Sequence, residues 1–350
     1  MDFTPPPGID VNESRQPQLY AAYISTFSLA VIAVGLRLIC RLGRNRPGLW
    51  WDDYAIFASL AVTTGNFVAM IIWVPRGLGM HIYKYGAEGF MHFFVNLFAI
   101  EILYTLSICF TKYSIILFYW RIFSAGSIRM PLYILTAIVT GWGIGVIVTT
   151  IFQCLPVQGF WDKSIQSVCG VNVNNFFIGN AVPNIVTDWA LLILPLPYIW
   201  RLQRNTAQKL AIYAIFLLGG FICIISIIRL VVMLDSYKVP SLDVTWVFIG
   251  PSTWTAVETN IGVVSACLPS LRPILRLFSR SAAAVAPTTP GSGPYVGSSY
   301  SHGSAWAKKE SYVRQKTDNF VTDYASDHNL TEINVQTTVD VQGERVGYAR

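Results

Sequence analysis

Charged residues are scarce in this sequence. Asp, Glu, Lys and Arg make up 13% of its 350 residues, about half of the roughly 25% that an average soluble domain carries. Hydrophobic residues reach 53%, and the mean hydropathy is +0.48. Such a chain cannot cover a globular surface with polar groups. The composition therefore argues against a soluble protein and for one embedded in a lipid bilayer.

Catalytic and metal-binding motifs are also missing. The sequence has no Walker loop, no kinase motif set and no Gly-x-Ser-x-Gly turn. Its six cysteines show no metal-type spacing, and its four histidines are scattered. We therefore expect no enzyme, no cofactor and no metal site. The residues before Tyr20 form no apolar stretch of a cleavable signal peptide, so the first transmembrane helix is expected to direct membrane targeting.

Long apolar segments dominate the chain instead. A spanning helix needs about 20 mostly apolar residues, and seven segments meet this length. They are residues 19–41, 52–74, 93–120, 131–154, 176–199, 210–234 and 247–268. The sequence therefore predicts an all-α membrane protein, a bundle of seven transmembrane helices over residues 19–280. Residues 1–18 form a short extracellular segment. Residues 281–350, rich in Ala, Ser, Gly and Pro without periodicity, are predicted to be a disordered cytoplasmic tail.

The basic residues predict the orientation of this bundle. Eleven Lys and Arg flank one set of helix ends and only five flank the opposite set. Cytoplasmic loops carry the excess of Lys and Arg, so the N-terminus is predicted to lie outside and the C-terminus inside. This bias explains the net charge of +6 better than nucleic-acid binding does. We place the protein in the plasma membrane, where Asn12 would be an extracellular glycosylation site.

Two cysteines are predicted to pair. Cys154 and Cys169 both fall at the outer end of the fourth segment or in the loop that follows. That side is oxidising, and a disulfide there would close a short loop worth roughly 3 kcal/mol by chain entropy. The other four cysteines lie within the segments or near the cytoplasmic face and are expected to be structural thiols.

Ionisable residues within membrane segments are costly without a partner or water, which makes them the sharpest functional candidates. At the cytoplasmic face, Arg37 and Arg41 lie at the end of the first segment. Asp52 and Asp53 open the second. A charge cluster of these residues is geometrically plausible, either as a functional group or as an interfacial salt bridge with helix N-terminal acids.

A second set lies deeper in the membrane. Glu101 and Arg229 fall in the outer half, Asp188 and Glu258 near the midplane, and Lys112 within reach of either midplane acid. One interpretation is a buried polar network that lines a cavity and serves as a ligand site, a switch or an ion path. The other is a set of static pairs that fix helix packing.

Retinal binding is not expected. A retinal Schiff base needs a lysine, which known rhodopsins carry in the seventh helix, and residues 247–268 contain none. Lys112 is the only lysine within a segment and lies in the third.

Several motifs in order resemble one family. They are Arg37/Arg41 before WDDY at 51–54, GLGMH at 77–81, KYSIILFYWRIF at 112–123, FQCLPVQGFWD at 152–162 with Cys169, TDWALLILPLPYIWRL at 187–202, IIRL at 227–230, and VE at 257–258 before CLPSLRPILR at 267–276. The chain resembles the fungal rhodopsin-domain family of seven-helix integral membrane proteins over about residues 20–280. That family includes the satratoxin-cluster membrane protein and is related to the Pth-type fungal receptors. The resemblance implies a receptor-type bundle without implying retinal.

Two features depart from receptor relatives. The Asp-Arg-Tyr triplet is absent at residues 119–123, which read YWRIF, and the seventh segment has no Asn-Pro-x-x-Tyr element. Our first hypothesis is a receptor-like sensor of a small apolar ligand held between the outer halves of helices three, five, six and seven. The Cys154–Cys169 loop would be its lid, and a cytoplasmic signalling partner would read its state. The alternative is a transporter that uses Lys112, Asp188 and Glu258 as coupling groups, or an accessory membrane protein of a biosynthetic pathway.

Overall fold

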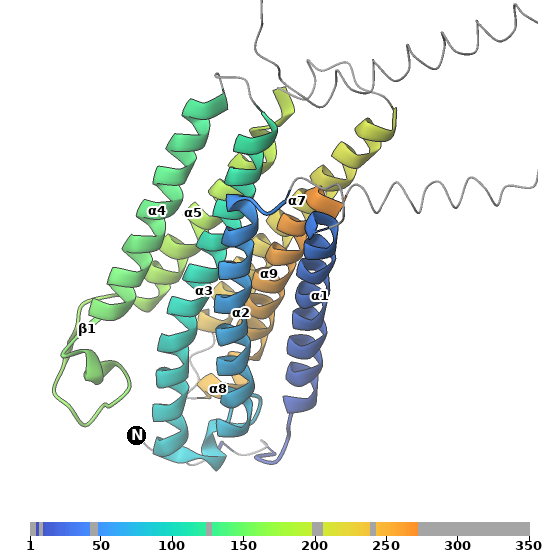
Figure 1. The fold of residues 1–350 in the computed structure, drawn as a ribbon. Helices are drawn as coiled ribbons and strands as arrows, with labels where there is room; N and C mark the ends of the chain where they lie inside the picture. Colours follow the sequence, from blue (N-terminus) through green and yellow to red (C-terminus); the bar gives the residue numbers. More distant parts are fainter. Residues whose placement is uncertain are drawn as a thin grey trace, which may run out of the picture. The chain divides into compact units, whose positions relative to one another are not determined.

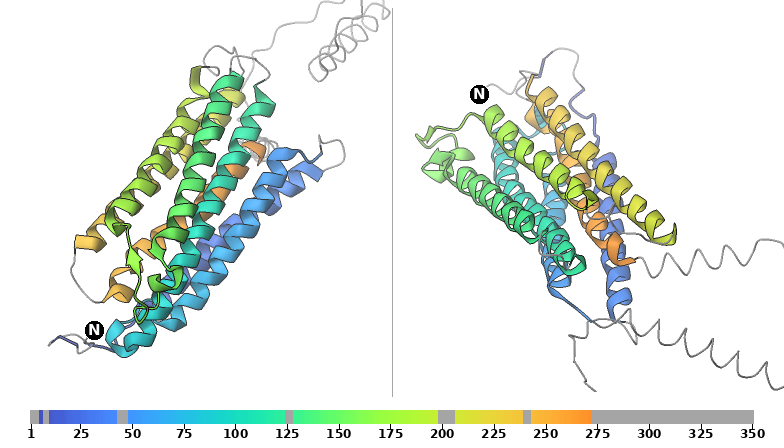
Figure 2. Two further views of the ribbon diagram at one scale, coloured as in Figure 1. Left: turned by 90° about the vertical axis from the view of Figure 1, so that its left-hand side faces the viewer. Right: turned by 90° about the horizontal axis from the view of Figure 1, so that it is seen from above.

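The structure is a computed structural model that describes residues 5–6, 10–42, 48–123, 128–197, 206–238 and 243–271. These residues fall within one compact unit, Met1–Ala286. Figures 1 and 2 show long helices running side by side. They are α1 (Gln16–Leu42), α2 (Trp51–Trp73), α3 (Gly86–Ile122), α4 (Arg129–Phe152), α5 (Val173–Ile193), α7 (Thr206–Lys238) and α9 (Ile249–Cys267).

Short elements complete the described fold. They are the 3-10 helices η1 (Val74–Arg76), η2 (Ile82–Lys84), η4 (Val157–Phe160) and η5 (Leu268–Leu271), the one-turn helix α8 (Val244–Val247), and the strands β1 (Cys154–Leu155) and β2 (Val168–Cys169). The β1–β2 loop and α8 lie at the end of the bundle where α1 begins (Figure 1). Following the predicted orientation, we call this end outer and the opposite end inner. The tail predicted over residues 281–350 lies outside the described residues.

The predicted all-α membrane fold is confirmed. Six of the described helices are long and apolar enough to cross a membrane. The seventh, α9, is not among them because it carries Glu258, Asn260 and several Ser and Thr. Most of these polar residues are buried, Glu258 and Asn260 among them, since α9 packs against α1, α2, α3 and α7. The bundle interior therefore shields them from lipid.

Helix bounds differ from the predicted segments mainly in α3 and α5. Helix α3 begins at Gly86 rather than at residue 93, because its first turns include Glu88 and His92 and so fall outside the continuous apolar run. Gly86 has φ +59°, a left-handed conformation that suits glycine at a helix start. The described α5 ends at Ile193 rather than at residue 199, and Pro195 and Pro197 follow. Proline disfavours helical backbone in the residue before it.

The sides of the bundle, which face away from its interior, are apolar. Large exposed hydrophobic side chains include Ile32 and Ile39 on α1 and Ile134 and Ile144 on α4. Inside the bundle, small residues allow close approach of helices. A Cβ at Gly143 of α4 would lie 2.6 Å from the Cys109 sulfur of α3. An exposed apolar surface on this scale is the surface of a membrane protein.

The predicted disulfide between Cys154 and Cys169 is confirmed. It joins β1 to β2, whose antiparallel register pairs Cys154 with Cys169 and Leu155 with Val168. The loop between the strands packs on α3: the Phe160 ring lies 5.3 Å from that of Phe94. The remaining cysteines in the described residues form no disulfide and are buried. Asn12, in a turn before α1, is exposed, and its glycosylation stays a prediction.

At the outer end, nearer the middle of the bundle, a second set of contacts joins the segment between α2 and α3 to the segment around α8. His81 Nδ1 forms a very short contact with Asp243 Oδ2, whose Oδ1 accepts a 2.9 Å hydrogen bond from the Ile82 amide. The His81 ring stacks on Trp246 at 4.1 Å between centroids. Gly79 joins both sides: its carbonyl accepts from the Arg15 amide and its own amide donates to the Thr245 carbonyl. We call residues 77–82 and 243–246 the outer cap.

Candidate ligand cavity and ionic network

Helical spacing brings the deep polar residues together. On α5, Asn180, Asn184 and Asp188 are four residues apart, so they share one face. On α3, Glu101 and Lys112 are eleven residues apart, which is about three turns along one face. Both faces point into the bundle, where every one of these residues except the half-buried Asp188 is buried.

Lys112 forms the first ion pair. Its Nζ lies 2.9 Å from Asp188 Oδ1. It also contacts Asn184 Oδ1 at 2.7 Å and Thr187 Oγ1 at 2.6 Å, and the Asn184 carbonyl oxygen at 2.9 Å. These acceptors more than use the three protons of an ammonium group. Lys112 therefore pairs with Asp188 rather than with Glu258, and all of these acceptors belong to α5.

Arg229 and Glu258 form the second ion pair. Arg229 Nε lies 2.6 Å from Glu258 Oε2, and the guanidinium stacks on Tyr104 with its Cζ 4.8 Å from the ring centroid. The Tyr104 hydroxyl donates to Glu258 Oε2 at 2.8 Å. Burial of both charged groups is offset by this pairing, because each has an opposite charge and further polar contacts.

Two neutral side chains link these pairs. Asn184 accepts from Lys112, and its Nδ2 donates to Glu258 Oε1 at 2.9 Å. The Ser226 hydroxyl lies 2.6 Å from Glu258 Oε1 and 3.0 Å from Asp188 Oδ2. Two cations and two anions therefore form one contiguous assembly across α3, α5, α7 and α9, which we call the ionic network. Its formal charges sum to zero.

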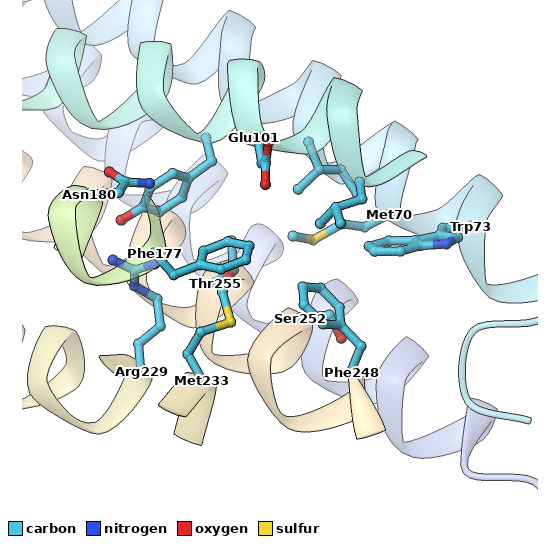
Figure 3. A pocket seen from close by; sticks show the side chains of 13 residues that line it. Met70, Trp73, Glu101, Phe177, Asn180, Arg229, Met233, Phe248, Ser252 and Thr255 are labelled. Carbon is cyan, nitrogen blue, oxygen red and sulfur yellow. The ribbon is translucent and has the colours of Figure 1, made fainter. Parts of the chain in front are cut away.

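Glu101 is not part of this network. No ion pair joins it to any described residue, and its Oε2 has no hydrogen-bond partner among them. Its side chain points instead into a cavity between α2, α3, α5, α7 and α9 (Figure 3). Arg229 lines the same cavity, so among the four charged residues of the ionic network it is the one on the cavity wall.

The cavity has a mixed lining. The space that the centre of a water-sized sphere can reach is about 30 Å³, room for about two water molecules. Six of the thirteen lining residues are aromatic or Met, and polar groups converge from several helices (Figure 3). The lining residues used below are Met70, Trp73, Glu101, Tyr104, Phe177, Asn180, Arg229, Met233, Phe248 and Thr255.

Three polar groups on the cavity wall have atoms without a hydrogen-bond partner in the described residues. They are Glu101 Oε2, Asn180 Oδ1 and Arg229 Nη2. Glu101 is 8% exposed, Asn180 5% and Arg229 4%. Unsatisfied buried polar atoms are rare in native proteins and call for an explanation. Their convergence on one cavity makes it the candidate binding site.

The cytoplasmic charge cluster lies at the inner end. Arg37 contacts Asp52 at 2.5 Å and Asp53 at 2.8 Å, and its Nη1 donates to the Ala266 carbonyl at 2.7 Å. Arg41 contacts the same two acids at 2.8 and 3.3 Å. Asp53 also accepts from the Trp50 amide at 3.0 Å, which caps α2.

Sequence reasoning missed several residues of these sites. Arg121 of α3 joins the cytoplasmic cluster, 3.5 Å from Asp52 Oδ1, so that three arginines face two aspartates. Asn184 carried a signal, since it lies one turn before Asp188 on the same face. His81 and Asp243 gave none, because 162 residues separate them.

The expected lid is wrong. No residue of the Cys154–Cys169 loop lines the cavity in the described part of the chain. The loop packs beside α3 through Phe160 and Trp161. Phe248, which follows α8 directly, lies on the cavity wall instead.

The fold and site thus define a seven-helix membrane protein with an ionic core and a partly polar cavity. Residues 36–277 match the fungal rhodopsin domain, and the protein belongs to that family, as the sequence motifs predicted. A SAT4 family membrane protein of Emericella nidulans is 30% identical over 235 residues, which cover 66% of this chain and 56% of that protein.

Two further relatives have different names. The satratoxin biosynthesis SC1 cluster protein 4 of Stachybotrys chartarum is 29% identical over 175 residues, covering 49% of this chain and 62% of that protein. A protein named receptor GIN3, of Arthrobotrys oligospora, is 25% identical over 175 residues, covering 50% and 42%. The relatives of this chain therefore include a protein named as a receptor and a protein named for a biosynthetic cluster.

Proposed function

We propose that this protein is a receptor-like sensor of a small ligand, which binds in the cavity between α2, α3, α5, α7 and α9. The observation that carries the proposal is the convergence on that cavity of three buried side chains, Glu101, Asn180 and Arg229, each with a polar atom that has no hydrogen-bond partner in the described residues. A ligand that pairs with these groups removes the cost of leaving them unsatisfied.

Arg229 provides a route from ligand to bundle. A ligand acceptor near Nη2 competes with Glu258 for the guanidinium, and Glu258 in turn holds Asn184 and Ser226. The contacts between α5, α7 and α9 would then differ between the free and bound states. A ligand shifts a conformational equilibrium only through such a difference in contacts. A cytoplasmic signalling partner would read the inner ends of these helices.

Retinal has no part in this proposal. Lys112 Nζ is held by Asn184, Thr187 and Asp188, and Lys112 does not line the cavity. The name of receptor GIN3 supports a sensing role at the level of the family. We place the protein in the plasma membrane, with the cavity toward the outer face.

A transporter is the second candidate. Asp188 and Glu258 both contact the Ser226 hydroxyl, which has a single proton to donate. A proton on either carboxyl group would complete the second hydrogen bond, so the ionic network has a place for a coupled proton. The relatives named for biosynthetic clusters suit export of a product, or an accessory role in its synthesis.

One experiment separates these candidates. The purified full chain in lipid nanodiscs is screened against a diverse set of small molecules by thermal unfolding, together with Thr255→Met and Thr253→Met variants. Thr255→Met fills the cavity. Thr253→Met makes the same change on the same helix, and both hydroxyls donate to a carbonyl one turn back. Cavity ligands will stabilise the wild type and Thr253→Met but not Thr255→Met.

These ligands then serve in two assays. Hydrogen exchange at the inner ends of α3 and α7 reports a conformational change, and sealed proteoliposomes report accumulation. For a receptor, exchange changes and no ligand accumulates. Accumulation that Asp188→Asn and Glu258→Gln abolish would establish the transporter. If no compound distinguishes the two threonine variants, the cavity is not a ligand site.

A further inference from the structure

We propose that the cavity is built for a ligand that carries a protonated amine, with its nitrogen held by Glu101. This inference rests on the proposed ligand site and adds the chemical class of the ligand. It starts from a charge count inside the bundle. Lys112 pairs with Asp188 and Arg229 with Glu258, which leaves Glu101 as a buried acid without a cation in the described residues.

The polar atoms at the cavity wall are mostly acceptors. Glu101 Oε2 and Asn180 Oδ1 have no hydrogen-bond donor among the described residues. The Thr255 hydroxyl donates its proton to the Pro251 carbonyl at 2.8 Å, so it can only accept a hydrogen bond from a ligand in the cavity. An ammonium group has three N–H donors and no acceptor, which complements this arrangement. The Arg229 Nη2 donor stands apart and suits an oxygen elsewhere on the same ligand.

Aromatic rings favour an organic cation over a neutral head group. Trp73, Tyr104, Phe177 and Phe248 all line the cavity, and the Trp73 and Phe248 rings lie 5.7 Å apart. The faces of such rings attract cations, more strongly when water is excluded. An apolar wall of this kind also makes an isolated carboxylate costly, so a cationic ligand gains from both features.

The size of the cavity sets the limits of the ligand. The space of about 30 Å³ accommodates an ammonium head and about one water molecule. The apolar body of an organic amine can fit only if side chains move. Met70 and Met233 line the cavity and are the side chains that would be displaced. Methionine is unbranched and repacks readily. The ligand is therefore a compact amine with an apolar body.

Matched probes test the head group. 2-Phenylethylamine and 2-phenylethanol share one apolar body and differ in the head, and sodium chloride and methylammonium chloride supply cations without a body. Binding is measured by titration against thermal unfolding of the full chain in nanodiscs, at constant ionic strength and neutral pH. The variants are Glu101→Gln, Asn180→Leu and the control Glu88→Gln, which removes an acid from the same helix at a side chain that is 86% exposed.

We expect 2-phenylethylamine to bind the wild type and Glu88→Gln equally, and to lose about 10- to 100-fold in affinity for Glu101→Gln, as for a hydrogen bond to a charged group. Asn180→Leu, which keeps the carboxylate, is expected to weaken binding less. Binding of the alcohol as strong as that of the amine, equal stabilisation by sodium, or an amine affinity unchanged in Glu101→Gln would each overturn the inference. So would the absence of amine binding to the wild type.

The outcomes keep the two proposals apart. Neutral compounds that Thr255→Met excludes and Glu101→Gln still binds would leave the ligand cavity in place and remove the amine. The proposal of a ligand cavity is refuted only if Thr255→Met and Thr253→Met respond alike to every compound in the broader screen.

Discussion

Arg229 Nε lies 2.6 Å from Glu258 Oε2, while Nη2 of the same guanidinium faces the cavity without a partner. One ion pair therefore joins a binding site to the charged interior of the bundle. Any group that draws the guanidinium toward the cavity weakens its contact with α9. This geometry gives the proposed sensor a physical switch, and it makes the pair the first target for mutation.

Breaking that pair should be costly. Glu258→Gln removes the counter-charge of a buried arginine and replaces one of the two oxygens that accept from Ser226, Asn184 and Tyr104 with an NH2 group, which cannot accept. The free energy of unfolding is expected to fall by about 3–5 kcal/mol, as for a buried pair that loses one partner. Thermal and denaturant unfolding in nanodiscs measure it.

The double variant Arg229→Met/Glu258→Met provides the control for this prediction. With neither charge left, it should recover most of the loss, because buried ion pairs replaced by apolar residues of similar size are often neutral. Additive losses from Arg229→Met and Glu258→Met would show that the two side chains act independently.

The arginines of the cytoplasmic cluster should differ in importance. Arg37 is 1% exposed and contacts two acids and a backbone carbonyl, so Arg37→Ala is expected to cost about 3 kcal/mol or more. The Arg121 side chain is 23% exposed and lies 3.5 Å from Asp52, and Arg121→Ala should cost about 0–1 kcal/mol. The same unfolding assay ranks them. Equal losses would contradict the burial argument.

Much of the fold could be predicted because it depends on local composition. Apolar runs identified the spanning helices, and the loop after the fourth run held the two cysteines that pair. Arg37 and Asp53 are 16 residues apart across a short connection, so their proximity followed from a helical hairpin. Such contacts need only sequence distance and helix geometry.

Contacts between distant helices could not be predicted, because they depend on helix rotation and on relative height. Depth alone left Lys112 between Asp188 and Glu258, and the structure pairs it with Asp188. Depth also grouped Glu101 with the network, although its side chain lies about three turns from Lys112 on α3. The outer cap was missed since nothing local to His81 points to Asp243.

The outer cap gives a prediction for local stability. Asp243→Asn weakens the contacts to the His81 ring and the Ile82 amide, so residues 77–82 should open more often. Hydrogen exchange is expected to rise at these residues while the middle of α3 stays protected, because local opening does not unfold the bundle. Asp162→Asn, which changes a half-buried acid in the β1–β2 loop, is the control and should leave the cap unchanged. Faster exchange throughout α3 would show that the cap supports the whole bundle.

The disulfide should matter for stability and not for ligand binding. Cys154 and Cys169 are 15 residues apart, and chain entropy assigns a loop of this length roughly 3 kcal/mol. The double variant Cys154→Ser/Cys169→Ser, which leaves no unpaired thiol from the bond, is expected to unfold at a lower temperature. The affinity for any cavity ligand should stay at the wild-type value, since no described residue of the loop lines the cavity. Titration of a ligand identified with the Thr255→Met and Thr253→Met pair measures this affinity below the unfolding temperature of the double variant. A loss of affinity as large as that of Thr255→Met would contradict this prediction. It would support the loop as a lid and would show that Phe160 and Trp161 hold α3 in its binding position.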